Sequence, residues 1–326
     1  MKQLLLPLLA FTAVLLALLV GGSMLTPAGL WQALLAGPQA GTAEAAIVWQ
    51  VRVPRVLTGL LVGAGLAVGG VVFQGLLRNP LAEPYTLGVS GGAVLGAALV
   101  IIGGLSGAVT VPVAAFLGAL AAAFWVDRLA LRRGFSSAML LLAGVMLNFL
   151  LSAVVLFIFA LATAHELHGV FLWLMGDLSS VTPALLASGS VLIAGGLLLT
   201  LRRARELDLL TLGEEKARQL GVDAARVRRE LFLAASLVTG ACVGVAGMIG
   251  FVGLLIPHLL RRWCGPGHRR LIPAAALGGG AFLTLADAVA RGLTAPTELP
   301  VGVITGMIGG GFFLLYLMRV RDWRLF

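Results

Sequence analysis

The sequence predicts an all-α polytopic membrane protein with ten transmembrane helices. Three observations support this fold class: 60% of the 326 residues are hydrophobic, 11% are charged, and the mean hydropathy is +1.04. Such a composition is typical of chains that cross a bilayer many times. The 44 glycines fit the same class, because helices in lipid pack through small residues. We expect a single transmembrane domain over residues 1–326, with one polar segment at about 204–228.

The ten helices are predicted from the lengths of the apolar stretches, since each crossing needs about 20 mostly apolar residues. The first stretch has Lys2 before an apolar core and so resembles a signal peptide. No small-residue cleavage site follows it, so we expect the span to be retained. The predicted spans are residues 4–25, 51–77, 87–103, 108–127, 137–163, 183–201, 231–249, 252–260, 271–290 and 299–318.

The region from 231 to 260 is too long for one upright helix and too short for two full ones. A single crossing would place the four arginines between 261 and 270 outside the cell, against the positive-inside rule. A full helix followed by a short one, with a turn at residues 247–253, returns them to the cytoplasm. This arrangement predicts ten spans with both termini cytoplasmic.

The distribution of basic residues supports this topology. Of the 23 Lys and Arg residues, it leaves 20 inside and three, Arg52, Arg55 and Arg291, outside. The net charge of +9 therefore reflects cytoplasmic loops and does not indicate a nucleic-acid partner.

The three outward arginines are the exceptions. All three are expected at the outer surface, because Arg52 and Arg55 precede the second span and Arg291 ends the ninth. One interpretation is contact with phosphates of membrane lipid. The other is docking of an acidic partner, since the forked guanidinium binds carboxylates through two hydrogen bonds.

Residues 78–92, RNPLAEPYTLGVSGG, connect the second and third spans through two prolines and three glycines. Irregular backbone at membrane depth is tolerated where it is buried in protein or lines a cavity. The segment is therefore either part of a gate or a plain turn.

Few other polar residues stand out within the spans. Asn148 and Ser152 share one face of the fifth span and either line a pathway or form hydrogen bonds between helices. His165 and His168 lack the spacing of a metal motif, and Cys242 and Cys264 form no ligand pair, so we expect no metal site.

Absent motifs also restrict the function. The chain has no GxxxxGK[ST] sequence for ATP, and Glu83 and Asp287, the acids nearest the bilayer centre, lie close to predicted span ends. An ion-coupled secondary carrier usually keeps acids at the centre, and an intramembrane enzyme would need paired catalytic groups. We therefore expect a protein that is not an enzyme and takes its energy from elsewhere.

The polar segment from 202 to 230 interrupts the apolar sequence and must lie outside the lipid. Thr211 is predicted to cap a short helix, with Glu214 in the capping-box position. Gly221 would end that helix, and Asp223 would begin a second short one. Two short helices joined by glycine at the cytoplasmic surface form either a compact docking element or a solvated amphipathic loop.

Several long motifs resemble the permease subunits of ABC importers for iron chelates, haem and cobalamin. The resemblance covers nearly the whole chain and is carried, in order, by RVPRVLTGLLVGAGLAVGGVVFQGLLRNPLAEPYTLGVSGGA, LLLAGVMLN, FLWLMGDLSS, LGEEKARQLGVD, GMIGFVGLLIPHLLRR and ELPVGVITGMIGGGFFLLYL.

The resemblance implies a type II ABC importer permease fold and a set of partners. These are a second copy of the chain, two ATP-binding subunits that hold ATP and Mg²⁺, and a periplasmic or lipoprotein substrate-binding protein. No cofactor is expected on this chain itself, which would lie in the inner membrane. The implied cargo is an iron chelate, either a ferric siderophore or haem, with cobalamin as the alternative.

The resemblance also implies roles for individual residues. The outer loop around FLWLMGDLSS resembles the short helices that close the periplasmic side. Docking of the binding protein is assigned to Arg52, Arg55 and Arg291. Coupling to the ATPase is assigned to Leu212, Gly213, Glu214, Ala217, Leu220 and Gly221. The cytoplasmic gate is assigned to Asn79, Leu81, Ser136 and Ser137.

Overall fold

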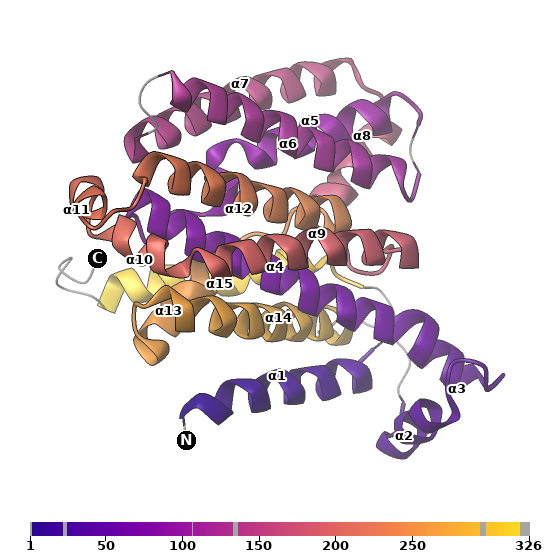
Figure 1. The fold of residues 1–326 in the computed structure, drawn as a ribbon. Helices are drawn as coiled ribbons and strands as arrows, with labels where there is room; N and C mark the ends of the chain where they lie inside the picture. Colours follow the sequence, from indigo (N-terminus) through magenta and orange to yellow (C-terminus); the bar gives the residue numbers. More distant parts are fainter. Residues whose placement is uncertain (1, 22–24, 106, 133–135, 294–297, 320–326) are drawn as a thin grey trace.

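The computed structural model describes residues 2–21, 25–105, 107–132, 136–293 and 298–319, and regular structure in these ranges is helical throughout (Figure 1). The helices are α1 (Lys2–Leu19), α2 (Pro27–Ala36), α3 (Ala43–Ala46), the π-helical η1 (Ile47–Arg52), α4 (Val53–Leu77), the 3₁₀ turn η2 (Pro84–Leu87), α5 (Val89–Ile102), α6 (Thr110–Leu131), α7 (Ser137–Leu161), α8 (Ala164–Leu174), α9 (Pro183–Arg202), α10 (Ala204–Thr211), α11 (Glu214–Gln219), α12 (Ala224–Ala246), α13 (Val252–Cys264), α14 (His268–Leu293) and α15 (Val301–Arg319).

Each predicted span corresponds to one of these helices, but fewer than ten are long enough to cross a bilayer unaided. Seven helical stretches within the described residues have the length and composition of a span, and α1 and α5 are shorter apolar helices. The short helix α13 has 13 residues. The count of ten crossings therefore stays a prediction.

The turn predicted within residues 247–253 is confirmed, since α12 ends at Ala246 and α13 begins at Val252. Two features were not predicted. The first is the pair of short helices α2 and α3 that precede α4, and the second is α10 between α9 and α11.

Local capping explains where several helices begin. Thr182 accepts a hydrogen bond from the backbone N–H of Leu185 and is followed by Pro183, a favourable first helical residue of α9. Thr163 and Glu166 form a reciprocal capping box at the start of α8. Asp223 caps α12 as predicted, by accepting from the N–H of Arg226 at 3.1 Å.

Helix α4 forms the centre of the bundle and packs between α12 on one side and α14 on the other (Figure 1). The approach to α14 is close because Gly63 and Gly279 face each other. A Cβ atom on either would overlap the other's carbonyl oxygen. Small residues at this crossing bring the backbones together, as in other membrane helix pairs.

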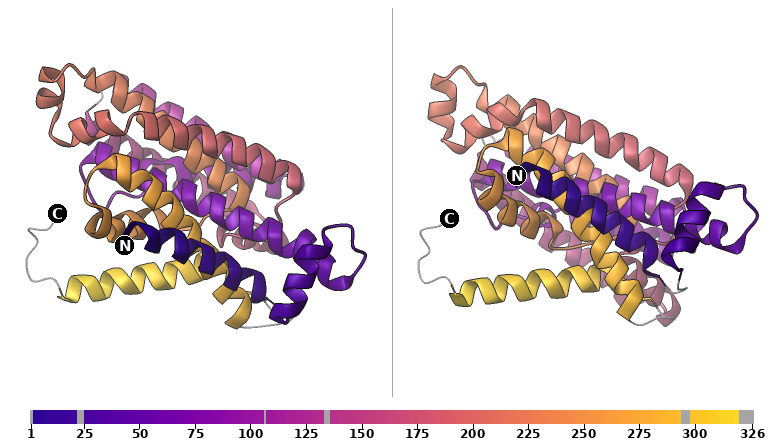
Figure 2. Two further views of the ribbon diagram at one scale, coloured as in Figure 1. Left: turned by 60° about the horizontal axis from the view of Figure 1, so that its bottom comes forward. Right: turned by 90° about the horizontal axis from the view of Figure 1, so that it is seen from below.

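Helix α15 lies at the edge of the bundle and packs on α13 and α14 along one side (Figure 2). Large apolar side chains project from its remaining surface, including Met307, Leu314 and Met318. The start of α1 and the end of α15 lie on the same side of the molecule as α11 (Figures 1 and 2).

Candidate functional site

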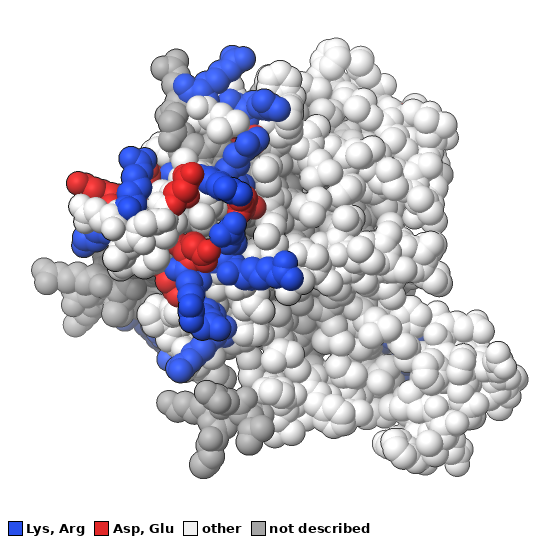
Figure 3. All heavy atoms as spheres, viewed as in Figure 1, with Lys and Arg blue, Asp and Glu red and all other residues white. Residues whose placement is uncertain are grey.

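Charged side chains gather at one end of the molecule, over α10, α11 and the start of α12, while the rest of this face is almost free of charge (Figure 3). We call this end the charged end. Because charge is costly in hydrocarbon, it must lie outside the lipid.

The first part of the charged end is α10, an amphipathic helix. Its Leu207 and Leu210 are buried in the core, and Asp208 and Glu206 face outward in part. Because α10 extends to Thr211, the Thr211 hydroxyl donates to the carbonyl of Asp208 at 2.6 Å. The prediction that Thr211 caps the next helix was therefore wrong. That helix, α11, begins at Glu214 after Gly213, whose φ of +113° favours glycine.

The structure separates the six predicted coupling residues into three kinds. Leu212 and Leu220 flank α11 and are 57% and 61% exposed. Gly213 and Gly221 have positive φ and shape the turns on either side. Ala217 is fully buried, and Glu214 forms an ion pair of 2.7 Å with Arg228, so these two residues fasten α11 to the body.

Further ion pairs attach the charged end to membrane helices. Arg229 on α12 binds both oxygens of Asp127 on α6, at 2.8 and 3.0 Å. Arg203 joins Glu206 and Glu230, each at 2.9 Å. The second helix of the polar segment was predicted to be short. It is instead the start of α12, which continues from the charged end into the bundle.

The four predicted gate residues lie at two neighbouring helix ends. The Ser137 hydroxyl donates to the carbonyl of Leu76 at 2.7 Å, which brings the start of α7 to the end of α4. Ser136 caps α7, and the Asn79 side chain accepts from the N–H of Leu81 at 2.9 Å, which stabilises the turn after α4. Leu81 is exposed.

The predicted pathway residues differ in environment. The Asn148 side chain is half-buried and lies 3.5 Å from the Ser90 hydroxyl of α5, which is a long contact between helices. Ser152 is exposed on the surface of α7.

At the opposite end of the bundle lie the three arginines that were expected at the outer surface. Their side chains are buried. Arg52, Arg55 and Arg291 are 3%, 6% and 3% exposed. Arg55 and Arg291 both bind the carboxylate of Asp287, with closest distances of 2.9 Å. No local pattern indicates this arrangement, because Arg55 and Asp287 are 232 residues apart.

Two of these arginines also form hydrogen bonds to backbone carbonyls at the end of α1. Arg291 donates to the carbonyls of Val20 and Ala17, at 2.6 and 3.0 Å, and Arg52 donates to those of Leu18 and Leu19. Carbonyls in the last turn of a helix have no partner within the helix, so the guanidinium groups satisfy them.

Arg55 has a second acidic partner that reaches the surface. Its Nη1 atom lies 2.6 Å from a carboxylate oxygen of Glu298, whose side chain is 40% exposed. Both residues line a cavity of about 950 Å³ between α8, the end of α12 and the start of α15, together with His165, His168 and Asp177. Burial works to raise the pKa of Asp177, but hydrogen bonds from Ser179 outweigh it and lower that pKa, so the carboxylate is ionised at neutral pH.

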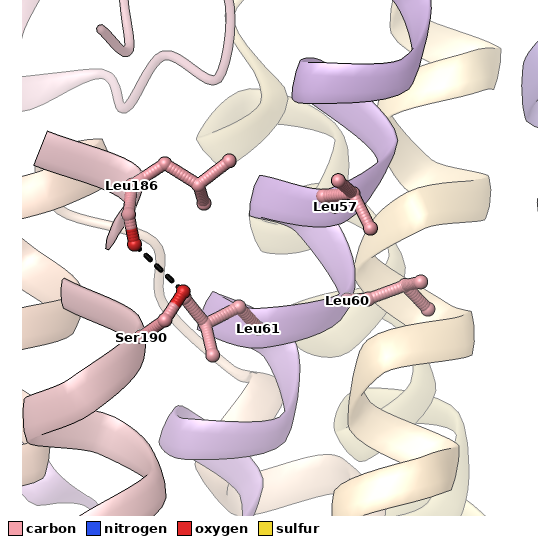
Figure 4. A pocket seen from close by; sticks show the side chains of 5 residues that line it. All are labelled: Leu57, Leu60, Leu61, Leu186 and Ser190. Carbon is pink, nitrogen blue, oxygen red and sulfur yellow. Dashed lines mark hydrogen bonds between the residues drawn. The ribbon is translucent and has the colours of Figure 1, made fainter. Parts of the chain in front are cut away.

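A second hollow, of about 340 Å³, lies between α4 and α9 and is lined by Leu57, Leu60, Leu61, Leu186 and Ser190 (Figure 4). The Ser190 hydroxyl donates to the carbonyl of Leu186 at 2.7 Å. The hollow therefore presents an almost wholly apolar wall.

Comparison with solved structures places this arrangement among transporters. A structure described as an inward-facing conformation of a metal-chelate type ABC transporter matches with a TM-score of 0.85 at 32% identity, over 98% of this chain and 99% of that one. The fold and the charged end thus define the membrane permease of an ABC importer. In such importers the ATPase is a separate subunit.

The FecCD transport family matches residues 8–319, and the chain belongs to that family. It is 44% identical over 316 residues to the cobalamin import system permease protein BtuC of Halobacterium salinarum, covering 94% of this chain and 82% of that protein. It is 41% identical over 283 residues to the hemin transport system permease protein HmuU of Yersinia pestis, covering 85% of each. Membership implies ATP-binding subunits and a substrate-binding protein as partners.

Proposed function

We propose that this chain carries a metal tetrapyrrole, either haem or cobalamin, across the inner membrane by alternating access. Similar relatives are named for hemin and for cobalamin. In both ligands a metal ion is held by the four nitrogens of a large macrocycle. Haem, one of the two iron chelates expected from the sequence, belongs to this class. A ferric siderophore is the competing outcome, to be separated by experiment.

The observation that carries the ATP-driven part of the proposal is the surface beside α11. Two exposed leucines, Leu212 and Leu220, flank the short helix α11, which is fastened to the body by Ala217 and by the Glu214–Arg228 ion pair. Exposed apolar side chains on a rigid support suit insertion into a pocket of a protein partner. We infer that this partner is the ATP-binding subunit, whose closure pushes on α11.

The proposed orientation places the charged end in the cytoplasm, together with both ends of the chain. Its excess of Lys and Arg supports this side, because cytoplasmic loops of membrane proteins are enriched in both. The turn after α4 and the start of α7, with Asn79, Leu81, Ser136 and Ser137, would then form the cytoplasmic gate.

Two copies of the chain would pair to form the translocation path. The support comes from α15 and α7, which project large apolar side chains such as Met307, Leu314, Phe149 and Phe157 away from the bundle. A second copy would cover these surfaces and leave Asn148 and Ser152 close to the path.

Docking of an acidic binding protein at the three arginines is retained as a proposal, with one change. Since the guanidinium groups are buried, a carboxylate from the partner would reach Arg55 by displacing the exposed Glu298. Arg52 and Arg291 would then act mainly by holding the end of α1 in place.

Reconstitution tests the proposed function. Liposomes that hold the permease and its ATPase subunits, with the binding protein outside, should accumulate haem or cobalamin when ATP is enclosed and not without it. Accumulation of a ferric siderophore alone would overturn the tetrapyrrole assignment, and uptake that is independent of ATP would overturn the importer.

Coupling through α11 is tested by Leu212→Asp and Leu220→Asp, which should abolish copurification of the ATPase. Ala225→Asp adds the same charge at an exposed position of α12 and serves as the control. Glu214→Arg is a poorer test, because it would also break the pair with Arg228. Retention of the ATPase by both leucine variants would contradict the assignment.

A further inference from the structure

Asp208 on α10 and His268 at the start of α14 form a close polar contact at the charged end. One carboxylate oxygen of Asp208 accepts from the backbone N–H of His268 at 2.9 Å and lies 2.5 Å from its Nδ1 atom. The two residues are 60 positions apart, so the contact connects α10 directly to a membrane helix that is not its neighbour in sequence.

The histidine is embedded where three helices meet. Its side chain is 5% exposed, and its Nε2 atom points towards Gly75 of α4. A Cβ atom on Gly75 would lie 3.1 Å from this nitrogen and 2.9 Å from Cδ1 of Leu207 on α10. Helices α10 and α14 therefore pack against the same point of α4.

Other ion pairs of the charged end connect to α12 and α6 rather than to α14. Glu214 fastens α11 to Arg228 of α12, and Arg229 of α12 binds Asp127 of α6. Loss of the Asp208 contact would leave these pairs intact. The surface offered by Leu212 and Leu220 would then persist, while the link to α14 would be weakened.

Helix α14 reaches from the charged end to the opposite end of the bundle. With 26 residues it is about 39 Å long at 1.5 Å per residue. Near its far end are Asp287 and Arg291, which bind Arg55 of α4 and the last carbonyls of α1. One helix thus connects His268 with the arginine cluster at the other end of the bundle.

We propose that Asp208 and His268 are positioning residues that form the joint through which movement of α11 and α10 is passed to α14 during transport. The inference rests on the proposed importer function. It assigns the transmission of force to a defined contact, in addition to the surface where the ATPase docks.

The test is the number of substrate molecules taken up per ATP hydrolysed, measured in the liposomes with the full complex and haem or cobalamin as the cargo. Asp208→Ala should lower this ratio by about fivefold or more, the lower range of typical coupling between distant sites. Binding of the ATPase and its basal hydrolysis should persist. Asp208→Asn should restore most of the ratio, because the amide oxygen still accepts both hydrogen bonds.

Glu206→Ala is the matched control on the same helix. It removes a partly exposed acid that pairs with Arg203, and Arg203 keeps its second partner, Glu230. The ratio should not change. If Asp208→Ala reduces ATPase binding and uptake together and leaves the ratio unchanged, the contact is merely structural and the proposal is overturned.

A second variant keeps the test decisive if Asp208→Ala does not assemble. His268→Ala removes the side-chain bond from the other partner, whereas His268→Asn keeps a donor close to the position of Nδ1. A lower ratio in the alanine variant than in the asparagine variant supports the joint, and equal ratios refute it. Failure of the wild-type complex to transport haem or cobalamin with ATP would instead count against the proposed function.

Discussion

Arg55 and Asp287 form a buried ion pair of 2.9 Å that joins α4 to α14 at the end opposite the charged end. Each side chain is at most 6% exposed, and the same carboxylate also binds Arg291. One buried acid is therefore shared by two buried guanidinium groups. Such an arrangement is sensitive to loss of the shared partner, because a buried charge without a counterion is costly.

Replacement of Asp287 by alanine should lower the free energy of unfolding by about 3–5 kcal/mol, the usual cost of breaking a buried pair. Glu298→Ala removes the exposed partner of Arg55 and should cost about 0–1 kcal/mol. Denaturant titration of the purified permease in detergent would measure both values. If both variants lose the same free energy of unfolding, the buried Arg55–Asp287 pair contributes no more to stability than the Arg55–Glu298 pair.

The crossing of α4 and α14 at Gly63 and Gly279 leads to a second prediction. Gly63→Ala would place a methyl group against backbone, which cannot move aside as a flexible side chain can. We expect a loss of about 1–3 kcal/mol from overpacking. Gly195→Ala in α9 is the control, since a Cβ atom there meets nothing within 4 Å. The thermal midpoint in detergent should fall for Gly63→Ala and hold or rise for Gly195→Ala.

The positions of the main helices were predictable because span length follows from bilayer thickness. Residues 51–77 and 137–163 were predicted, and α4 and α7 occupy Val53–Leu77 and Ser137–Leu161. The turn between α12 and α13 was also predicted, from glycine content and the placement of basic residues. These signals are local, so a single sequence contains them.

The environment of the arginines was not predictable, because it depends on contacts across the fold. A rule based on charge and topology places Arg55 at the outer surface, but its burial is decided by Asp287, which is distant in sequence. The same limit applies to Thr211. Its capping role was wrong because α10, a helix of eight residues with a mixed composition, extends to that position.

Glu83 leads to a prediction about pH. Its half-buried carboxylate accepts from the backbone N–H of Phe251 at 2.8 Å, in the turn between α12 and α13. Burial raises the pKa of Glu83 above its ordinary value of 4.5. The folded protein then holds the proton to a higher pH than the unfolded chain does. The contribution of Glu83 to stability therefore falls as the pH rises above about 4.5.

Glu83→Gln removes this titration but keeps an oxygen that accepts from Phe251. The thermal midpoint of Glu83→Gln minus that of the wild type should increase as the pH is raised from about 4.5 towards neutrality. Glu44→Gln, which removes an exposed carboxyl group of α3, is the control. A difference between Glu83→Gln and wild type that is constant across this range would contradict the shifted pKa.

The last prediction concerns the exposed partner of Arg55. If a carboxylate of the binding protein must displace Glu298 from Arg55, removal of the Glu298 charge should strengthen docking. Ion pairs open to solvent are worth about 0.2–1 kcal/mol, so Glu298→Gln should tighten binding by about 1.4- to fivefold. Titration of labelled binding protein against permease in nanodiscs would measure the change.

Glu44→Gln removes an exposed acid from α3 without touching Arg55 and should leave the affinity unchanged. Raising the salt concentration should weaken docking in all three proteins, because salt screens the attraction between the approaching carboxylate of the partner and the arginines. Weaker docking of Glu298→Gln would mean that Glu298 itself contacts a basic group of the partner. In that case the arginines would serve to hold α1, α4 and α14 together, and the acidic docking site would have to be sought on another surface.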